Sequence, residues 1–253
     1  MEIVDFGNTG LKVSRLSIGT GTHGYSGRSD QTALGVEGLA GLLQQAYDLG
    51  VVFWDAADGY GSHPHVARAM QSVPRDHLVI TTKTTARSRE DAIRDVDRFL
   101  GELGTDVVDI VLLHCMTSGD WPERYAGAMA ALSQAKQQGK IRAVGLSCHA
   151  LDALRRAVSC DWVDVVLARI NHTGAAMDGS PPEVAPVLAE LAQAGKAVYG
   201  MKILGCGQLL KDRHRAIDYV FGLGSVQAVT IGMTGSEQLV DNVHLVEAVT
   251  AAS

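Results

Sequence analysis

The chain has 253 residues, of which 46% are hydrophobic and 20% charged, and its formal net charge is −6 at pH 7. This length allows a buried core and suits one large α/β domain, and the composition is that of a folded protein. The net negative charge argues against a nucleic-acid partner, since a basic surface is what binds nucleic acid. No apolar run approaches the ~20 residues that span a membrane. The first residues lack a signal-peptide pattern, so we expect a cytoplasmic protein.

Cysteine and histidine spacing gives no indication of a metal site. The four cysteines are scattered without any C-x-x-C pair, which argues against zinc and iron–sulfur centres and favours free thiols. No H-E-x-x-H motif is present, so a metal-dependent barrel hydrolase is a weak alternative and no metal is expected.

The chain opens with a predicted β-hairpin over Glu2–Arg15, turning at Gly7–Gly10. Eight short β-rich segments then recur along the rest of the sequence. They are Leu16–Gly19, Val51–Asp55, Leu78–Lys83, Val107–His114, Ile141–Ser147, Val163–Ala168, Ala197–Met201 and Val226–Ile231.

Segments with helical spacing of apolar residues lie between several of these strands. They are Gly38–Leu49, Ser88–Leu103, Pro122–Gln138, Pro182–Ala194 and Ser236–Val249. Four of them stop at a glycine just before a strand, at Gly50, Gly104, Gly139 and Gly195, as a helix C-terminus does.

This alternation predicts a (β/α)8 TIM barrel. Strands that are apolar on both faces indicate a parallel sheet covered on both sides, and eight strand units favour closure over an open doubly wound sheet. Gly19, Gly21 and Gly24 do fit the glycine-rich turn of an open dinucleotide-binding sheet, but a lone match is weak. We predict a single domain over residues 1–253, with the hairpin closing the bottom of the barrel.

Active sites of such barrels lie at the carboxyl ends of the strands, and titratable residues gather there. The second strand ends at Asp55, with Tyr60 in the loop beyond it; the third ends at Lys83 and the fourth at His114. Each alone has an ordinary explanation as a turn cap, a solvated lysine, a core histidine or a packed ring. Their arrival at successive strand ends indicates an active site.

These four side chains suit protonation of a carbonyl oxygen. A phenol is a weak acid at neutral pH, and a nearby ammonium lowers its pKa by favouring the phenolate. A carboxylate keeps the ammonium charged and in place, while a neutral imidazole orients a substrate oxygen or relays a proton. We therefore predict that Asp55, Tyr60, Lys83 and His114 are catalytic.

The chain resembles the aldo-keto reductase family along nearly its whole length. The segments that carry the resemblance are the hairpin Asp5–Ser14, the signature Trp54–Gly61, Thr81–Lys83, Leu112–His114 and Gly139–Ser147. The resemblance implies carbonyl reduction with NAD(P)H bound across the barrel mouth, Tyr60 donating the proton. Positions that match cofactor contacts in the family are Thr20, Gly21, Asp55, Ser147, Met201, Lys202, Gly205, Gly207, Gly232, Gln238 and Asn242.

Several positions depart from the family pattern. Leu167 stands where many members have a glutamine, Met201 where an aromatic ring is usual and Cys148 where asparagine is common. Gly232 and Gln238 replace a lysine and an arginine that hold a 2′-phosphate, which weakens a preference for NADPH. Other members with Gly and Gln still bind NADP(H), so NADP(H) stays favoured over NAD(H).

The substrate side is less defined by the sequence. Loops are short and a long carboxyl-terminal lid is not expected, so the pocket should be open and polar. Candidate substrate contacts are Tyr25, Trp121, His149 and Asn171, with His23 and His172 nearby. An alternative to the enzyme is a non-catalytic NADP(H)-binding subunit that senses redox state for a partner, as the potassium-channel β subunits resemble this family. The sequence names neither the substrate nor the oligomeric state.

Overall fold

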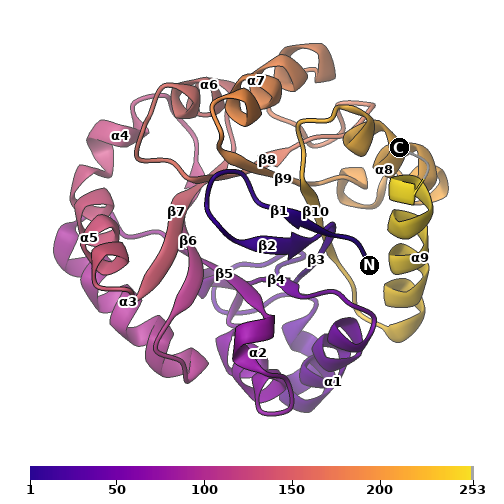
Figure 1. Cartoon of the computed structure of the whole chain (residues 1–253), viewed down its shortest axis with the longest axis horizontal. Coiled ribbons are helices and arrows are strands. Elements are labelled where there is room, and N and C mark those ends of the chain that lie inside the picture. The colour runs from indigo at the N-terminus through magenta and orange to yellow at the C-terminus, as the bar shows by residue number, and fades with distance from the viewer. Residues whose placement is uncertain (252–253) are drawn as a thin grey trace.

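A computed structural model of the chain describes residues 1–251 and has the predicted architecture. Eight parallel strands form a closed barrel in the order β10-β3-β4-β5-β6-β7-β8-β9, surrounded by helices (Figure 1). The strands are β3 Leu16–Gly19, β4 Phe53–Asp55, β5 Val79–Thr84, β6 Val108–Met116, β7 Ile141–Cys148, β8 Val165–Arg169, β9 Ala197–Met201 and β10 Ala228–Gly232. Every predicted barrel strand is confirmed, with small differences at the ends.

The outer layer contains more helices than the sequence predicted. The helices are α1 Gly35–Asp48, α2 His63–Met70, α3 Arg89–Leu103, α4 Trp121–Arg124, α5 Ala126–Gln137, α6 Leu151–Val158, α7 Pro181–Gln193, α8 Arg213–Gly222 and α9 Ser236–Ala251. Three were not predicted: α2, α6 and α8. The predicted Pro122–Gln138 helix is two helices, α4 and α5, which meet at Tyr125. No helix within residues 1–251 is long and apolar enough to cross a membrane.

The hairpin closes the amino end of the barrel, as predicted. Its strands β1 (Ile3–Asp5) and β2 (Lys12–Ser14) lie across the barrel opening in Figure 1. The Phe6 ring between them is fully buried and meets the rings of Phe53 and Tyr199 edge-on, with centroids 5.4 and 5.8 Å apart. Gly7 is required at the contact, because a Cβ there would lie 2.4 Å from the backbone nitrogen of Ala197.

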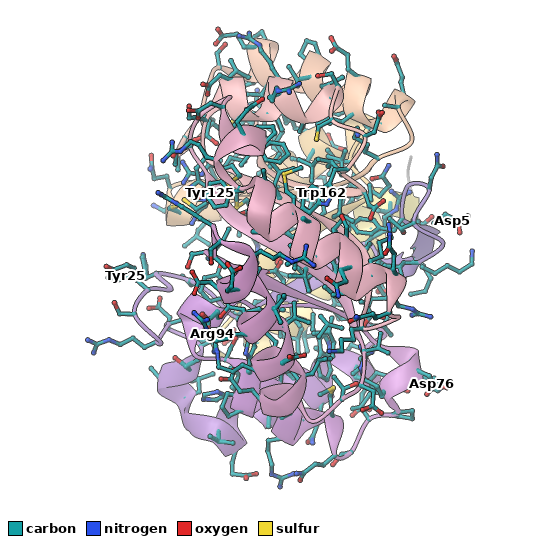
Figure 2. The ribbon with its side chains drawn as sticks, turned by 90° about the vertical axis from the view of Figure 1, so that its left-hand side faces the viewer. Asp5, Tyr25, Asp76, Arg94, Tyr125 and Trp162 are labelled. Carbon is teal, nitrogen blue, oxygen red and sulfur yellow. The ribbon has the colours of Figure 1, made fainter. Side chains whose placement is uncertain are left out.

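Alternation along the strands separates two cores. Inward side chains form a small cluster under the hairpin: Phe53, Val79, Ile110, Leu112, Ala143, Val165, Leu167, Ala197, Tyr199 and Ala228. Outward side chains pack against the helices in a larger cluster. The same inward phase continues to the carboxyl ends of the strands, where polar residues replace apolar ones. The side view places Asp5 and Tyr25 at opposite ends of the molecule, at the hairpin and at this polar end (Figure 2).

Candidate active site

Lys83 and Asp55 form a buried ion pair at the carboxyl end of the barrel. Lys83 Nζ donates to Asp55 Oδ1 over 2.5 Å and to the carbonyl oxygen of Ala56 over 2.8 Å. The lysine side chain is fully buried and that of Asp55 nearly so. A buried charge is tolerated only when it is paired in this manner. The pair therefore fixes a cation at a defined point beneath the barrel mouth.

Tyr60 lies above this cation. It ends the short 3₁₀ helix η2 (Asp58–Tyr60), and Lys83 Nζ is 4.9 Å from the centre of its ring. Its hydroxyl is 3.4 Å from His114 Nε2, and the two rings meet edge-on at 5.5 Å. The four residues predicted as catalytic are thus brought together.

Two glycines hold the Tyr60 ring in place. A Cβ on Gly21 would lie 2.2 Å from Tyr60 Cε2, and one on Gly24 would lie 2.4 Å from Tyr60 Cδ1. Both distances are far below van der Waals contact. The loop after β3 therefore reaches the aromatic ring only because these positions carry no side chain.

The electrostatics of the cluster differ in one respect from the prediction. Burial raises the pKa of Tyr60, Lys83 lowers it and Asp55 raises it, and the balance is a raised pKa. Burial acts to lower the pKa of Lys83, but Asp55 and Tyr60 outweigh it and the pKa is raised. Burial together with Lys83 and His149 lowers the pKa of His114 to about 3. At neutral pH the site thus holds a phenol, an ammonium and a neutral imidazole.

Tyr199 is a member of the cluster that the sequence did not indicate. This β9 residue is fully buried, and its hydroxyl donates to Asp55 Oδ2 over 2.8 Å. Each oxygen of the Asp55 carboxylate therefore has its own donor. This role could not be predicted from the sequence, because Tyr199 lies inside an apolar strand, where a tyrosine resembles any other core aromatic residue.

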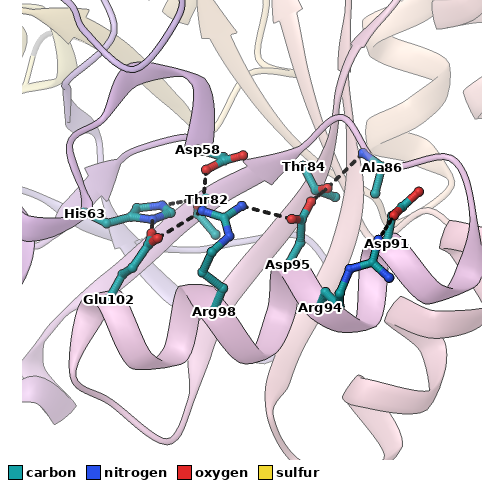
Figure 3. A network of polar contacts seen from close by, with 10 residues as sticks. All are labelled: Asp58, His63, Thr82, Thr84, Ala86, Asp91, Arg94, Asp95, Arg98 and Glu102. Atoms are coloured by element: carbon teal, nitrogen blue, oxygen red, sulfur yellow. Dashed lines mark hydrogen bonds and ion pairs between the residues drawn. The ribbon is translucent and has the colours of Figure 1, made fainter.

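A polar network supports the site from outside the barrel (Figure 3). Arg98 of α3 contacts Asp58, two residues before Tyr60, over 2.7 Å, and also Asp95 and Glu102. His63 bridges Glu102 at 2.6 Å and Thr82, the neighbour of Lys83, at 2.7 Å. The network thereby ties the loop of Tyr60 and the strand of Lys83 to one helix. His63 and His65 have H-x-H spacing, yet residues 1–251 contain no group of three side chains able to hold a metal.

An elongated cavity of about 320 Å³ begins at Asp55 and Tyr60 and extends to the end of β10. Of the predicted cofactor positions, those that line it are Gly21, Asp55, Met201, Lys202, Gly207 and Gly232. Leu167 also lines it, together with Cys206 of the 3₁₀ helix η4 (Gly205–Gly207).

The other predicted cofactor positions do not line this cavity. Thr20 Oγ1 lies 2.9 Å from the carbonyl oxygen of Asp55, and Ser147 Oγ accepts from the backbone nitrogen of Cys115. Gln238 accepts from the backbone nitrogen of Thr234. Gly205 is buried, and Asn242 is buried with its Oδ1 unpartnered among the described residues.

None of the four predicted substrate contacts, Tyr25, Trp121, His149 and Asn171, lines this cavity. Trp121 belongs to α4 in the outer layer, where its indole is buried against Trp162 and donates to the carbonyl oxygen of Ala153. The buried amide of Asn171 holds together the loop after β8. Tyr25 is 80% exposed at a loop tip and does not line the cavity.

Three histidines were predicted in or near the substrate pocket. His23 lines the cavity and contacts Asp30, while His172 contacts Asp212. His149 is half-buried just beyond the end of β7.

Comparisons with known proteins agree with this geometry. The family model described as "Aldo/keto reductase family" matches residues 15–249. The chain is 25% identical to an L-galactose dehydrogenase of Arabidopsis thaliana, covering 97% of this chain and 88% of that protein. It is 25% identical to an NADH-specific methylglyoxal reductase of Escherichia coli (strain K12), covering 70% of this chain but only 61% of that protein.

Solved structures show the same barrel. PA4992 of Pseudomonas aeruginosa, described as an aldo-keto reductase, superposes with a TM-score of 0.80 at 26% identity, covering 98% of this chain and 95% of that one. AKR11C1 of Bacillus halodurans in its holo form superposes with a TM-score of 0.82 at 19% identity, covering 98% of this chain and 91% of that one. At this identity the similarity is one of fold. Since the family match covers nearly the whole sequence, this chain belongs to the aldo/keto reductase family.

Proposed function

We propose that the chain reduces an aldehyde or ketone, sugar-like carbonyls included, to an alcohol, using Tyr60 as the proton donor. Family membership supports an oxidoreductase that uses a nicotinamide cofactor. The observation that carries the assignment to Tyr60 is its position between Lys83 and His114, with its hydroxyl 3.4 Å from His114 Nε2.

The proposed proton transfer follows from the charges in the site. Burial keeps Tyr60 protonated at rest, so the proton is available to a carbonyl oxygen. As it leaves, the Lys83 ammonium stabilises the phenolate, and Asp55 keeps that ammonium charged. The neutral His114 imidazole and the Tyr60 hydroxyl are close enough to contact one substrate oxygen together. A bound reduced nicotinamide supplies the hydride.

The residues along the cavity fit an extended dinucleotide. Lys202 and the bare backbone at Gly207 both line the cavity, and Lys202 would offer a cation to the pyrophosphate. Asn242, which lies outside the cavity lining, has a buried Oδ1 without a partner among residues 1–251, and this oxygen would suit a donor such as an adenine amino group. No lysine or arginine occurs from Gly232 to Asn242 that could hold the 2′-phosphate of NADP(H). The preference for NADP(H) over NAD(H) therefore stays a prediction. Fluorescence titration with NADPH and NADH decides between the two.

The proposal is tested by following NAD(P)H oxidation with a panel of aldehydes and ketones. Tyr60→Phe should lower kcat by at least about 10²-fold, because the general acid is lost while the ring is kept. Its affinity for the cofactor should change little. Tyr47→Phe, at a phenol that contacts His77 before the start of β5, is the matched control and should keep full activity.

Equal turnover of wild type and Tyr60→Phe would overturn the role of Tyr60. A wild-type protein that binds the cofactor tightly but turns over no carbonyl would instead favour a redox-sensing subunit.

A further inference from the structure

His149 and Arg169 extend the inward-facing polar layer beyond the four catalytic candidates. On β7 the inward positions run through Ala143 and Ser147, and His149 is the next in phase. On β8 they run through Leu167, which lines the cavity, and Arg169 is the next in phase. Both residues therefore lie at the carboxyl end of the barrel, beside the cavity lining and not part of it.

His149 also stands next to the strand of His114. Its backbone nitrogen donates to the carbonyl oxygen of Met116 over 2.8 Å, and Met116 pairs with Cys148 in the sheet. His114 lies two residues before Met116 on β6. The two imidazoles thus come from neighbouring strands at the same end of the barrel.

Contacts of Arg169 fix the tautomer of His149. The Arg169 guanidinium donates to Asp178 Oδ1 over 2.9 Å from one terminal nitrogen and to His149 Nδ1 from the other. A guanidinium has donors only, so His149 Nδ1 must carry the lone pair. The hydrogen of the neutral ring is then on Nε2. Asp178 therefore fixes the position of the Arg169 guanidinium, and Arg169 in turn fixes the orientation of the His149 ring.

Among the described residues, the hydrogen on His149 Nε2 has no acceptor. No hydrogen bond to this atom occurs within residues 1–251, although the ring is half-buried. Burial lowers the pKa of His149 to about 4, and three cations on three elements add to the effect: Arg169 of β8, Lys202 after β9 and Lys83 of β5. The ring therefore stays a neutral donor at neutral pH.

We propose that His149 Nε2 donates a hydrogen bond to a second substrate oxygen, on the carbon next to the reacting carbonyl, and that Arg169 is the positioning residue that sets its tautomer. The inference rests on the proposed function, because it places the reacting carbonyl at Tyr60 and His114. The substrates selected are hydroxyaldehydes, hydroxyketones and vicinal dicarbonyls. An unsubstituted aldehyde leaves the donor unused, which costs affinity.

A matched pair of substrates tests the selection. Glycolaldehyde and acetaldehyde differ by one hydroxyl, and their free-carbonyl concentrations can be determined by proton NMR. In wild type, kcat/KM should favour glycolaldehyde by about tenfold. His149→Phe should remove most of that preference, mainly by raising KM for glycolaldehyde, with a much smaller effect on acetaldehyde. His149→Gln, which restores an amide donor, should recover much of it.

His77→Phe is the matched control, since it makes the same change before β5, at the opposite end of the barrel. It should leave the substrate preference intact. If His149→Phe lowered kcat/KM equally for both substrates, or for neither, the inference would be overturned. If Tyr60-dependent reduction is present without any preference in wild type, the proposed function stands and the inference fails.

Nitrogen-15 NMR gives a readout that does not need turnover. The wild-type His149 ring should show the Nε2–H tautomer at pH 7, and Arg169→Met should release it to a mixture. Ethylene glycol, the product of glycolaldehyde reduction, should shift the Nε2 resonance, and ethanol should not. An Nδ1–H tautomer in wild type, or no response to ethylene glycol, refutes the inference even if no carbonyl is turned over.

Discussion

The Tyr199 hydroxyl donates a hydrogen bond of 2.8 Å to Asp55 Oδ2, on the side of the carboxylate opposite Lys83. The two residues are 144 positions apart in the chain, and both are buried. Tyr199 also packs against Phe6 and Phe53, so it joins the hairpin plug below to the ion pair above. The orientation of Asp55, and through it that of Lys83, thus depends on the apolar interior of the barrel.

Tyr199→Phe should weaken both stability and turnover. The change leaves Asp55 Oδ2 buried without its donor, which costs about 1–3 kcal/mol of unfolding free energy. The carboxylate is then free to rotate, so kcat should fall several-fold with a smaller change in KM. Urea unfolding and steady-state kinetics measure the two effects. Tyr47→Phe, which removes an exposed hydrogen bond to His77, is the control and should cost less. Wild-type stability in Tyr199→Phe would mean that the bond contributes nothing.

Gly21→Ala should displace the Tyr60 ring without unfolding the protein. The new Cβ would lie 2.2 Å from Tyr60 Cε2, so the ring must move relative to His114 and Lys83. A misplacement of about 1 Å can cost about 10²-fold in rate, and we expect kcat to fall by at least about tenfold. Gly41→Ala is the control: this helical glycine faces open space, and alanine should raise stability by up to about 1 kcal/mol. Full activity in Gly21→Ala would show that the loop after β3 moves to make room and the Tyr60 ring stays in place.

His114 should make the stability depend on pH in a known direction. Its pKa falls from the ordinary 6.5 to about 3 in the folded state, so between these values the unfolded chain binds more protons than the folded one. Unfolding free energy therefore rises with pH through this window and is lost as the pH falls from about 6.5 toward 3. A His114→Gln variant lacks this contribution.

Urea unfolding of wild type and His114→Gln at pH 7, 6, 5 and 4 measures the effect. The stability difference, wild type minus variant, should shift steadily against the wild type as the pH falls. A constant difference would show that His114 titrates normally in the folded protein.

Local patterns in the sequence were enough for the barrel and for the four clustered residues. Each barrel strand is a short apolar run, and helix ends such as Gly104 and Gly195 have positive φ, the conformation that glycine adopts without strain. Asp55, Lys83 and His114 were found because strand ends in a parallel barrel must meet at one mouth. This inference needs only chain order and the positions where apolar runs stop.

Other features depend on contacts between distant segments. The helices α2, α6 and α8 are at most ten residues long, and such helices owe their stability to packing more than to propensity. Trp121 and Asn171 do not line the cavity, and a sequence does not show whether an aromatic or amide side chain in a loop faces a cavity or packs within the fold. The sign of the Tyr60 pKa shift also depends on burial, which is a property of the whole neighbourhood.

The sequence by itself therefore determined the barrel and the identity of the residues at its mouth, because strand periodicity and strand ends are local properties. Only the tertiary structure decided which side chains meet: Tyr199 with Asp55, and Arg169 with His149. The physical reason is that strands apolar on both faces do not reveal which residues point inward, and that phase is fixed when the barrel closes.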